Sequence, residues 1–401
     1  MTKLAIDGGK PVKSAPFPPW PEFRPEDVES VASVLRSGKV NYWTGTEGRR
    51  FEEEFAQSCA STHAVAVANG TAALELALHA LEIGPEAEVV VPCRSFVSSA
   101  SCVVVRGAKP VMADVDRDSQ TLTARTVEQV LTARTKAIIA VHLAGWPCDM
   151  DPIMELAASR GLKVIEDCAQ AQGARYKGRP VGSIGHAAAF SFCQDKIMTT
   201  GGEGGMMITN DLRVWESAWS YRDHGRRNEG LKSQEKGLVY RQVYDTVGTN
   251  WRMTEMQSAI GRSLLNTVVS SVERRRKIAT RLNEAFAGIP ALRLTLPPAE
   301  VEHAYYRYYV FVRPERLRDG WNRERILAAI GAEGIPCFSG SCPEIYEEKG
   351  FADYRPPQPS KVARELGETS LAMLAHPTIR DSDVSDVIHA VEKVMAHASA
   401  W

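Results

Sequence analysis

The sequence lacks both an excess of one charge and a long apolar run. Its 401 residues carry 48 Lys and Arg against 49 Asp and Glu, a formal net charge of −1, and 44% of the residues are hydrophobic. A protein that binds nucleic acid through phosphates usually has a strong basic excess, and a disordered chain combines low hydrophobicity with high net charge. The composition therefore indicates a folded, globular protein with no nucleic-acid partner.

Signals for a membrane or for secretion are also missing. No apolar run approaches the ~18 residues that a membrane-spanning helix needs. The opening Met-Thr-Lys-Leu-Ala-Ile-Asp turns polar before the apolar core of a secretory signal could form. We therefore expect no membrane partner and a cytoplasmic location.

The eight cysteines contain no Cys-x-x-Cys pair and no dense framework, so we expect mostly reduced core thiols. Cys337 and Cys342 are close in sequence, but no matching pair of Cys or His ligands lies nearby, and we expect no metal site. No Gly-x-Gly-x-x-Gly follows a strand, which disfavours a nucleotide-dependent dehydrogenase. Walker-type, serine-hydrolase and zinc signatures are absent as well.

Short β-branched runs alternate with helical patterns between residues 60 and 210. This alternation is typical of strands joined by crossover helices in a mainly parallel sheet. The predicted strands are residues 64–68, 88–92, 109–115, 136–143, 162–167, 187–192 and 206–210. Residues 71–81 are apolar on almost every side, which predicts a helix buried on more than one face. The fold class predicted here is α/β.

The pattern changes after residue 250. Residues 254–287 keep apolar side chains at helical spacing and predict a long helix, with one break possible. Strands at 292–296 and 305–312 and helices at 323–333 and 383–396 follow, as in a smaller α+β domain. We predict two domains, residues 1–265 with a Pro-rich extended arm at 14–21, and residues 266–401. A helix over 24–37, opened by Pro25, precedes the sheet.

Two predicted strand ends carry groups suited to catalysis. Lys196 follows the strand 187–192 and precedes Gly201-Gly202-Glu203-Gly204-Gly205, while Asp167 ends the strand 162–167. In open α/β sheets ligands bind outside the carboxyl ends of strands. An acid that keeps a ring nitrogen protonated and a lysine that holds an aldehyde as an imine are what pyridoxal phosphate requires. A structural salt bridge is the alternative for this pair.

Two further elements could bind the same cofactor. Asn69-Gly70-Thr71-Ala72 turns a strand into a helix and exposes backbone amides at the helix N-terminus, which suits a phosphate. A plain helix cap would have the same pattern. Phe96, after the strand 88–92, could stack on a ring or pack in the core.

The whole pattern resembles the sugar and cyclitol aminotransferases of the DegT/DnrJ/EryC1/StrS family, which are fold-type I pyridoxal phosphate enzymes. The resemblance runs nearly end to end. It rests on Leu4-Ala5-Ile6-Asp7-Gly8-Gly9, Trp43-Thr44-Gly45, Asn69-Gly70-Thr71, Glu166-Asp167-Cys168-Ala169-Gln170, Ser191-Phe192 with Lys196, the glycine run, and Gly248-Thr249-Asn250-Trp251-Arg252-Met253. It implies a large, mainly parallel-sheet α/β/α domain and a smaller C-terminal α+β domain.

The resemblance also implies roles for single residues. Lys196 would form the imine with pyridoxal 5'-phosphate, and Asp167 would pair with the pyridine nitrogen. The other cofactor contacts implied are Gln170 to the ring hydroxyl, Phe96 on the ring face, and Gly70, Thr71, Ala72 and Ser191 at the phosphate. Asn250 would reach the phosphate of a neighbouring subunit, which implies a homodimer with shared active sites. Thr249 replaces a commoner tyrosine, and Gln170 replaces the histidine of many relatives.

The implied reaction is transamination, with pyridoxamine 5'-phosphate as the form that carries the amine. Glutamate or glutamine would supply the amine to a keto sugar or keto cyclitol. Lys196 argues against the dehydrating branch of the family, which has a histidine there. We favour a nucleotide-linked 4-keto-6-deoxy sugar as acceptor, for surface-glycan or antibiotic sugar synthesis. A keto cyclitol of the scyllo-inosose type is the alternative, and a non-catalytic pyridoxal phosphate-binding regulator is a remote one.

The acceptor-binding residues are open at this stage. The aromatic and basic candidates are Tyr305, Tyr306, Arg307, Tyr308, Arg226 and Arg227. Such side chains could contact a base or a diphosphate, but they are equally typical of a half-buried strand and a solvated turn. His224 could face the substrate or lie in an ordinary loop.

Overall fold

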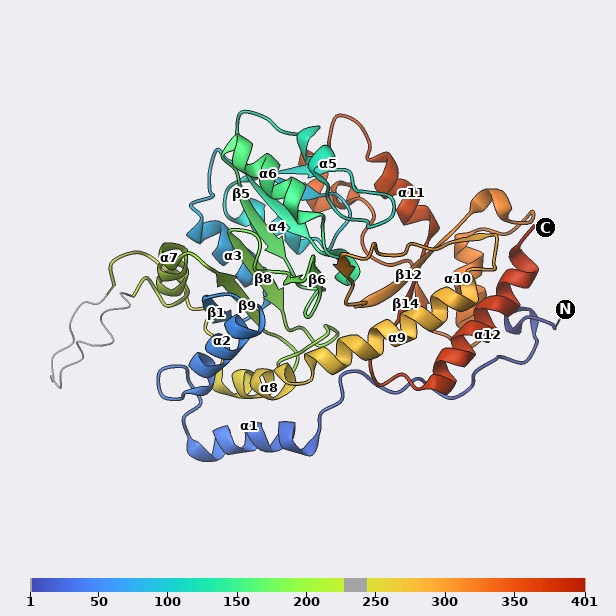
Figure 1. The fold of residues 1–401 in the computed structure, drawn as a ribbon, viewed down its shortest axis with the longest axis horizontal. Coiled ribbons are helices and arrows are strands. Elements are labelled where there is room, and N and C mark those ends of the chain that lie inside the picture. The colour runs from blue at the N-terminus through green and yellow to red at the C-terminus, as the bar shows by residue number, and fades with distance from the viewer. Residues whose placement is uncertain (1, 227–243, 401) are drawn as a thin grey trace.

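A seven-stranded sheet forms the centre of the computed structural model, which describes residues 2–226 and 244–400 (Figure 1). The strand order is β1-β9-β8-β5-β4-β2-β3. β9 is antiparallel to both neighbours, and the other pairs are parallel. The strands are β1 (His63–Val67), β2 (Glu88–Pro92), β3 (Lys109–Ala113), β4 (Thr135–Val141), β5 (Lys163–Asp167), β8 (Ala187–Ser191) and β9 (Gly205–Thr209). All seven predicted strands are present, and the mainly parallel α/β prediction is confirmed.

Both faces of this sheet are covered. Val89 and Val91 belong to one apolar cluster, whereas Val90 between them belongs to another. Because successive side chains of a strand point to opposite faces, each face has its own core. The helices of this part are α1 (Pro25–Ser37), α2 (Glu47–Ser58), α3 (Gly70–Ala80), α4 (Ser98–Val105), α5 (Ala124–Glu128), α6 (Met150–Arg160), α7 (Leu212–Arg222) and α8 (Glu255–Leu265).

The predicted long helix is broken once. It divides into α8 and α9 (Val268–Phe286), and α9 runs from the central sheet toward the C-terminal domain (Figure 1). Val268 and Val272 pack in a core with β8, while Ile278 and Leu282 pack in the C-terminal core. One helix therefore joins the two cores, and the division at residue 265 stays a prediction.

The C-terminal domain is an antiparallel sheet with helices. Its strand order is β10-β12-β14-β13. The elements are β10 (Leu292–Arg293), β12 (Arg307–Val312), α10 (Arg323–Ala332), β13 (Cys337–Phe338), α11 (Lys361–Thr369), β14 (Ser370–Leu374) and α12 (Asp381–Ala398). A separate small sheet, β11-β6-β7, joins β11 (Val301–Glu302), β6 (Arg175–Tyr176) and β7 (Arg179–Pro180). Neither this small sheet nor α11, β13 and β14 was predicted.

The N-terminal arm packs on the C-terminal domain of its own chain. Leu4 is part of the C-terminal core, and Lys13 Nζ lies 2.6 Å from Asp383 Oδ1. Thr378 Oγ1 donates to the Pro19 carbonyl at 3.0 Å, and the Trp20 ring stacks on His376. The arm, which precedes α1, is therefore packed against residues near the C-terminus of the chain.

None of the helices in the described ranges combines the length and the apolar character needed to cross a membrane.

Glycine substitutions can test the packing of α8 against α2, which carries Phe51. A Cβ on Gly261 would lie 2.6 Å from Phe51 Cζ, whereas a Cβ on Gly331 in α10 would have no neighbour within 4 Å. Alanine favours a helix over glycine, so Gly331→Ala should stabilise the protein by about 0.5–1 kcal/mol. Gly261→Ala should destabilise it by about 1–3 kcal/mol, because the buried ring must move. Unfolding midpoints that rise for both variants would contradict this packing.

Candidate active site

Lys196 lies in a tight loop between β8 and β9. Its N–H donates to the Cys193 carbonyl at 3.0 Å, and the Trp20 indole N–H donates to the Lys196 carbonyl at 2.9 Å. Gly201 and Gly202 have φ of 87° and 126°, a region that favours glycine, so the loop can turn back to β9. The Lys196 side chain is 16% exposed, and its Nζ is 3.8 Å from Asp195 Oδ1. The lysine is thus held by its backbone while its side chain stays partly exposed.

Asp167 is a buried carboxylate at the end of β5. Its Oδ2 accepts from Ser99 Oγ at 2.8 Å, and its Oδ1 accepts from the Ala169 N–H at 3.1 Å. No Lys, Arg or His within residues 2–226 and 244–400 forms an ion pair with it. Burial raises the pKa of Asp167, while the Ser99 hydrogen bond and the charge of Lys196 oppose the rise. A buried acid of this kind fits a protonated ring nitrogen, because that N–H would stabilise its charge.

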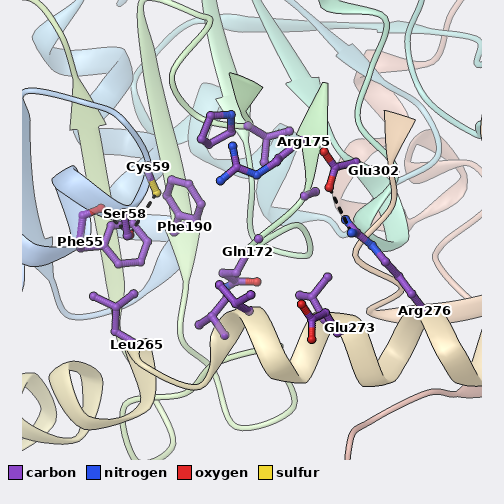
Figure 2. A pocket seen from close by; sticks show the side chains of 17 residues that line it. Phe55, Ser58, Cys59, Gln172, Arg175, Phe190, Leu265, Glu273, Arg276 and Glu302 are labelled. Carbon is purple, nitrogen blue, oxygen red and sulfur yellow. Dashed lines mark hydrogen bonds and ion pairs between the residues drawn. The ribbon is translucent and has the colours of Figure 1, made fainter. Parts of the chain in front are cut away.

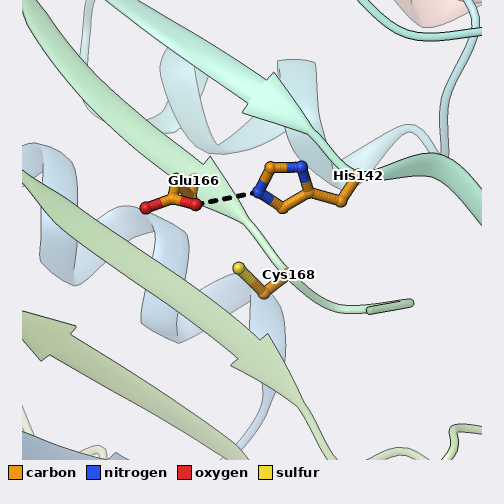
Figure 3. Close-up of side chains that lie close together, drawn as sticks. All are labelled: His142, Glu166 and Cys168. Carbon is orange, nitrogen blue, oxygen red and sulfur yellow. Dashed lines mark hydrogen bonds and ion pairs between the residues drawn. The ribbon is translucent and has the colours of Figure 1, made fainter. Parts of the chain in front are cut away.

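Glu166, the neighbour of Asp167, fixes this end of the sheet (Figure 3). Its two oxygens accept from the backbone N–H groups of Gly182, Ile184 and Gly185 and from the His142 ring at 3.0 Å. His142 Nδ1 accepts from the Cys148 N–H, so its Nε2 is the nitrogen that carries the proton toward Glu166.

His142, Glu166 and Cys168 lie close enough to suggest a metal site. The Glu166 oxygens already accept four N–H groups, however, and this accounts for the cluster as a hydrogen-bond network. The backbone N–H of His142 also donates to the Asp167 carbonyl at 3.1 Å. The network therefore positions Asp167. The sequence showed Glu166 beside Asp167, but nothing in it pointed to His142.

Gly70 and Ser191 meet at the N-terminus of α3. A Cβ on Gly70 would lie 2.6 Å from Ser191 Cβ, so only glycine lets the helix approach β8 this closely. The Asn69 side chain accepts from the Ala72 N–H at 2.8 Å, which engages that amide within the chain. The N–H groups of Gly70 and Thr71 have no acceptor among the residues the structure describes. Two free amides, the Ser191 hydroxyl and a helix N-terminus suit a phosphate.

The other three predicted cofactor residues, Gln170, Phe96 and Asn250, differ in their contacts and exposure. Gln170 Oε1 accepts from the Ala144 N–H at 2.7 Å, so the side chain is anchored beside Asp167. Phe96 is 62% exposed, and it is therefore not a core residue of the single chain. Asn250 is exposed too, and its Oδ1 accepts from the Arg252 N–H at 3.4 Å. Neither Phe96 nor Asn250 has a hydrogen bond to Lys196 or Asp167.

The candidate acceptor residues divide into two groups. Tyr306 and Arg307 both contact Asp195, next to Lys196, and the Tyr306 hydroxyl donates to its carboxylate. Tyr305 instead stacks on His303, and the buried Tyr308 donates to Asn283 Oδ1 at 2.8 Å.

Candidates from the loop after α7 lie elsewhere. The Arg226 guanidinium lies 4.4 Å from the Trp43 ring centre, and His224 has a positive φ of 63°. Arg227 falls outside the described residues.

A separate cavity of about 240 Å³ lies between α2, α9 and the β6–β7 pair (Figure 2). Its lining includes Phe55, Cys59, Gln172 and Arg276 but none of the predicted site residues. Gln172 connects it to the site, since its amide N–H donates to the Ser191 carbonyl at 2.6 Å. This cavity is therefore separated from the end of β8, which carries Ser191, by the Gln172 side chain.

Comparison with known proteins places this geometry in a family. Residues 21–392 match the DegT/DnrJ/EryC1/StrS aminotransferase family. The chain is 36% identical over 363 residues to GDP-perosamine synthase of Caulobacter vibrioides, which covers 88% of this chain and 92% of that protein. It is 34% identical to dTDP-3-amino-3,4,6-trideoxy-alpha-D-glucose transaminase of Streptomyces venezuelae, over 93% of both chains.

A solved structure agrees. The aminotransferase from Psychrobacter cryohalolentis is 47% identical, with a TM-score of 0.93 over 95% of this chain and 99% of that one. The chain thus belongs to the DegT/DnrJ/EryC1/StrS aminotransferase family and is a sugar aminotransferase, of a family that depends on pyridoxal phosphate.

Proposed function

We propose that this enzyme transfers an amino group from glutamate to a nucleotide-linked keto sugar in the cytoplasm, with a 4-keto-6-deoxy sugar as the preferred acceptor. The observation that carries this proposal is the buried carboxylate of Asp167, which forms no ion pair among the described residues, near the partly exposed side chain of Lys196. The names of two relatives, one a GDP-sugar enzyme and one a dTDP-3-amino-sugar enzyme, support a nucleotide-linked sugar as the acceptor.

The cofactor would be held at both ends. We assign Gly70, Thr71 and Ser191 to its phosphate, because their free donors converge at the start of α3. Asp167 would accept from the ring nitrogen, and Gln170 would approach the ring from the same strand end. Phe96 and Asn250 are exposed in the single chain, which suits the proposed homodimer with shared active sites.

Pyridoxal phosphate, when bound, supplies an electron sink for breaking bonds at the amine-bearing carbon. The chain's own groups then have separate tasks. Lys196 Nζ would hold the cofactor and, once released from it by the incoming amine, would be free to accept and return a proton. Asp167 would keep a proton on the ring nitrogen, and the Glu166–His142 network holds Asp167 in place. The Trp20 indole N–H, from the N-terminal arm, donates to the Lys196 carbonyl and so restrains the backbone of the lysine loop.

Gly70→Ala tests the phosphate assignment. The added methyl group would clash with Ser191 and separate the amides from the hydroxyl, so the dissociation constant of pyridoxal phosphate should rise about 10- to 100-fold. Gly84→Ala is the matched control, because its Cβ would meet only the Arg106 carbonyl at 3.7 Å. Fluorescence titration measures both. Equal affinity in the two variants would remove Gly70 from the phosphate site.

Asp167→Asn and Asp167→Ala test the role of the buried charge. Asn keeps the size and the Ser99 contact but cannot stabilise a protonated ring, so both variants should lose about 100- to 1,000-fold in kcat. Bound cofactor, followed by absorbance, shows whether the site is still loaded. A fully active Asn variant would show that the charge of Asp167 is not used.

The acceptor is tested with a panel of substrates. With glutamate as donor, GDP- and dTDP-linked 4-keto-6-deoxy sugars should be aminated, and scyllo-inosose should not. Product formation is followed by mass spectrometry, with Lys196→Ala as the inactive control. Turnover of the free cyclitol alone would replace the nucleotide sugar with a keto cyclitol as acceptor.

A further inference from the structure

The surroundings of Lys196 contain more positive than negative charge. Asp195 is the only carboxylate that pairs with Lys196 or Arg307 in the part of the chain that the structure describes, at 3.8 Å and 3.3 Å. Arg307 comes from β12 of the C-terminal domain, and Lys196 comes from the large sheet. One carboxylate therefore faces two cations from different domains.

Arg275 is a third cation close to Lys196 and Arg307. Arg275 on α9 is only 1% exposed, and its Nη1 donates to the carbonyls of Tyr305 and Tyr306 at 3.3 Å and 3.4 Å. Its Nε and Nη2 have no hydrogen-bond partner among the described residues, and it forms no ion pair there, although its guanidinium carbon lies 5.3 Å from the Trp20 ring centre. Burial, with the charge of Arg307 added, lowers the pKa of Arg275 to about 9. The positive charge of this cluster is therefore not neutralised within the described chain.

Lys196 and Arg307 both lie against the ring of Tyr306. The Tyr306 ring centre is 4.8 Å from Lys196 Nζ and 4.9 Å from the Arg307 guanidinium carbon. Both side chains are partly open, with 16% and 24% of their surfaces exposed. In an amino acid the carboxylate is attached to the carbon that bears the amine. A donor that reacts beside Lys196 therefore carries a carboxylate into the region that Lys196 and Arg307 share around Tyr306 and Asp195.

We propose that Arg307 binds a carboxylate of the amino donor, which takes the place of Asp195 on its guanidinium. The planar guanidinium can hold a carboxylate with two parallel hydrogen bonds. Arg275 adds the uncompensated charge that makes an anion favourable there. Gly70, Thr71 and Ser191 bind the cofactor phosphate elsewhere, so the two anions do not compete. The inference rests on the proposed function only in taking an amino acid as donor.

The test uses the donor half of the reaction without any acceptor. The protein loaded with pyridoxal phosphate is mixed with L-glutamate, and conversion of the cofactor is followed by absorbance. Arg307→Gln should raise the glutamate concentration for half-maximal conversion about 10- to 100-fold, the cost of a charged hydrogen-bonded pair. Arg307→Lys should lie between this variant and the original. Arg313→Gln, an exposed arginine on the loop after the same strand, is the control and should change nothing.

A second measurement does not depend on turnover. Glutarate carries the two carboxylates but no amine, and its binding is followed by titration calorimetry. Arg307→Gln should weaken glutarate binding by a similar factor, and Asp195→Asn should tighten it, because the competing carboxylate is removed. Retained cofactor shows that each variant is folded.

Two results would overturn the proposal. One is unchanged use of glutamate and unchanged glutarate binding in Arg307→Gln. The other is a defect confined to the acceptor half of the reaction. No acceptor is present in the main experiment. The effect of Arg307→Gln on glutamate use can therefore be interpreted even if the nucleotide-sugar proposal fails.

Discussion

A buried carboxylate without a cation, Asp167, is the constraint on which the rest of the site depends. Burial raises its pKa, and only Ser99, the Ala169 N–H and nearby charges oppose that rise. A protein keeps such a group where a ligand completes it. Glu166 holds the same strand end with four hydrogen bonds and leaves Asp167 little freedom to turn away. Under the proposed function, the end of β5 would therefore set the position of the cofactor ring.

The second organising element is α9, which belongs to both cores. Its first turns pack under the large sheet, and its later turns pack in the C-terminal domain. Arg275, in the middle of this helix, holds the β12 end through the carbonyls of Tyr305 and Tyr306. This brings Arg307 to Asp195 and Lys196. The proposed donor site therefore depends on α9, because this one helix packs in both cores.

Parts of the fold were predictable because their local pattern agrees with their environment. The seven strands of the large sheet are apolar runs between turns, and the helix at α3 is apolar all round because it is buried. β14 was missed because Leu, Ala and Met favour helix and the segment directly follows α11, and it becomes a strand through pairing with β12 and β13. The two-residue strands of β6, β7 and β11 carry too little local signal to be recognised.

The sequence by itself determined three local features of the proposed site: the acid at the end of β5, the lysine in the loop after β8, and the glycine that begins α3. These follow from local order, since parallel strands deliver their carboxyl ends to one edge of a sheet. Only the tertiary structure decided that His142 and Glu166 fix Asp167 and that Arg307 meets Asp195. Those contacts join residues up to 112 positions apart, and no local pattern encodes such pairings.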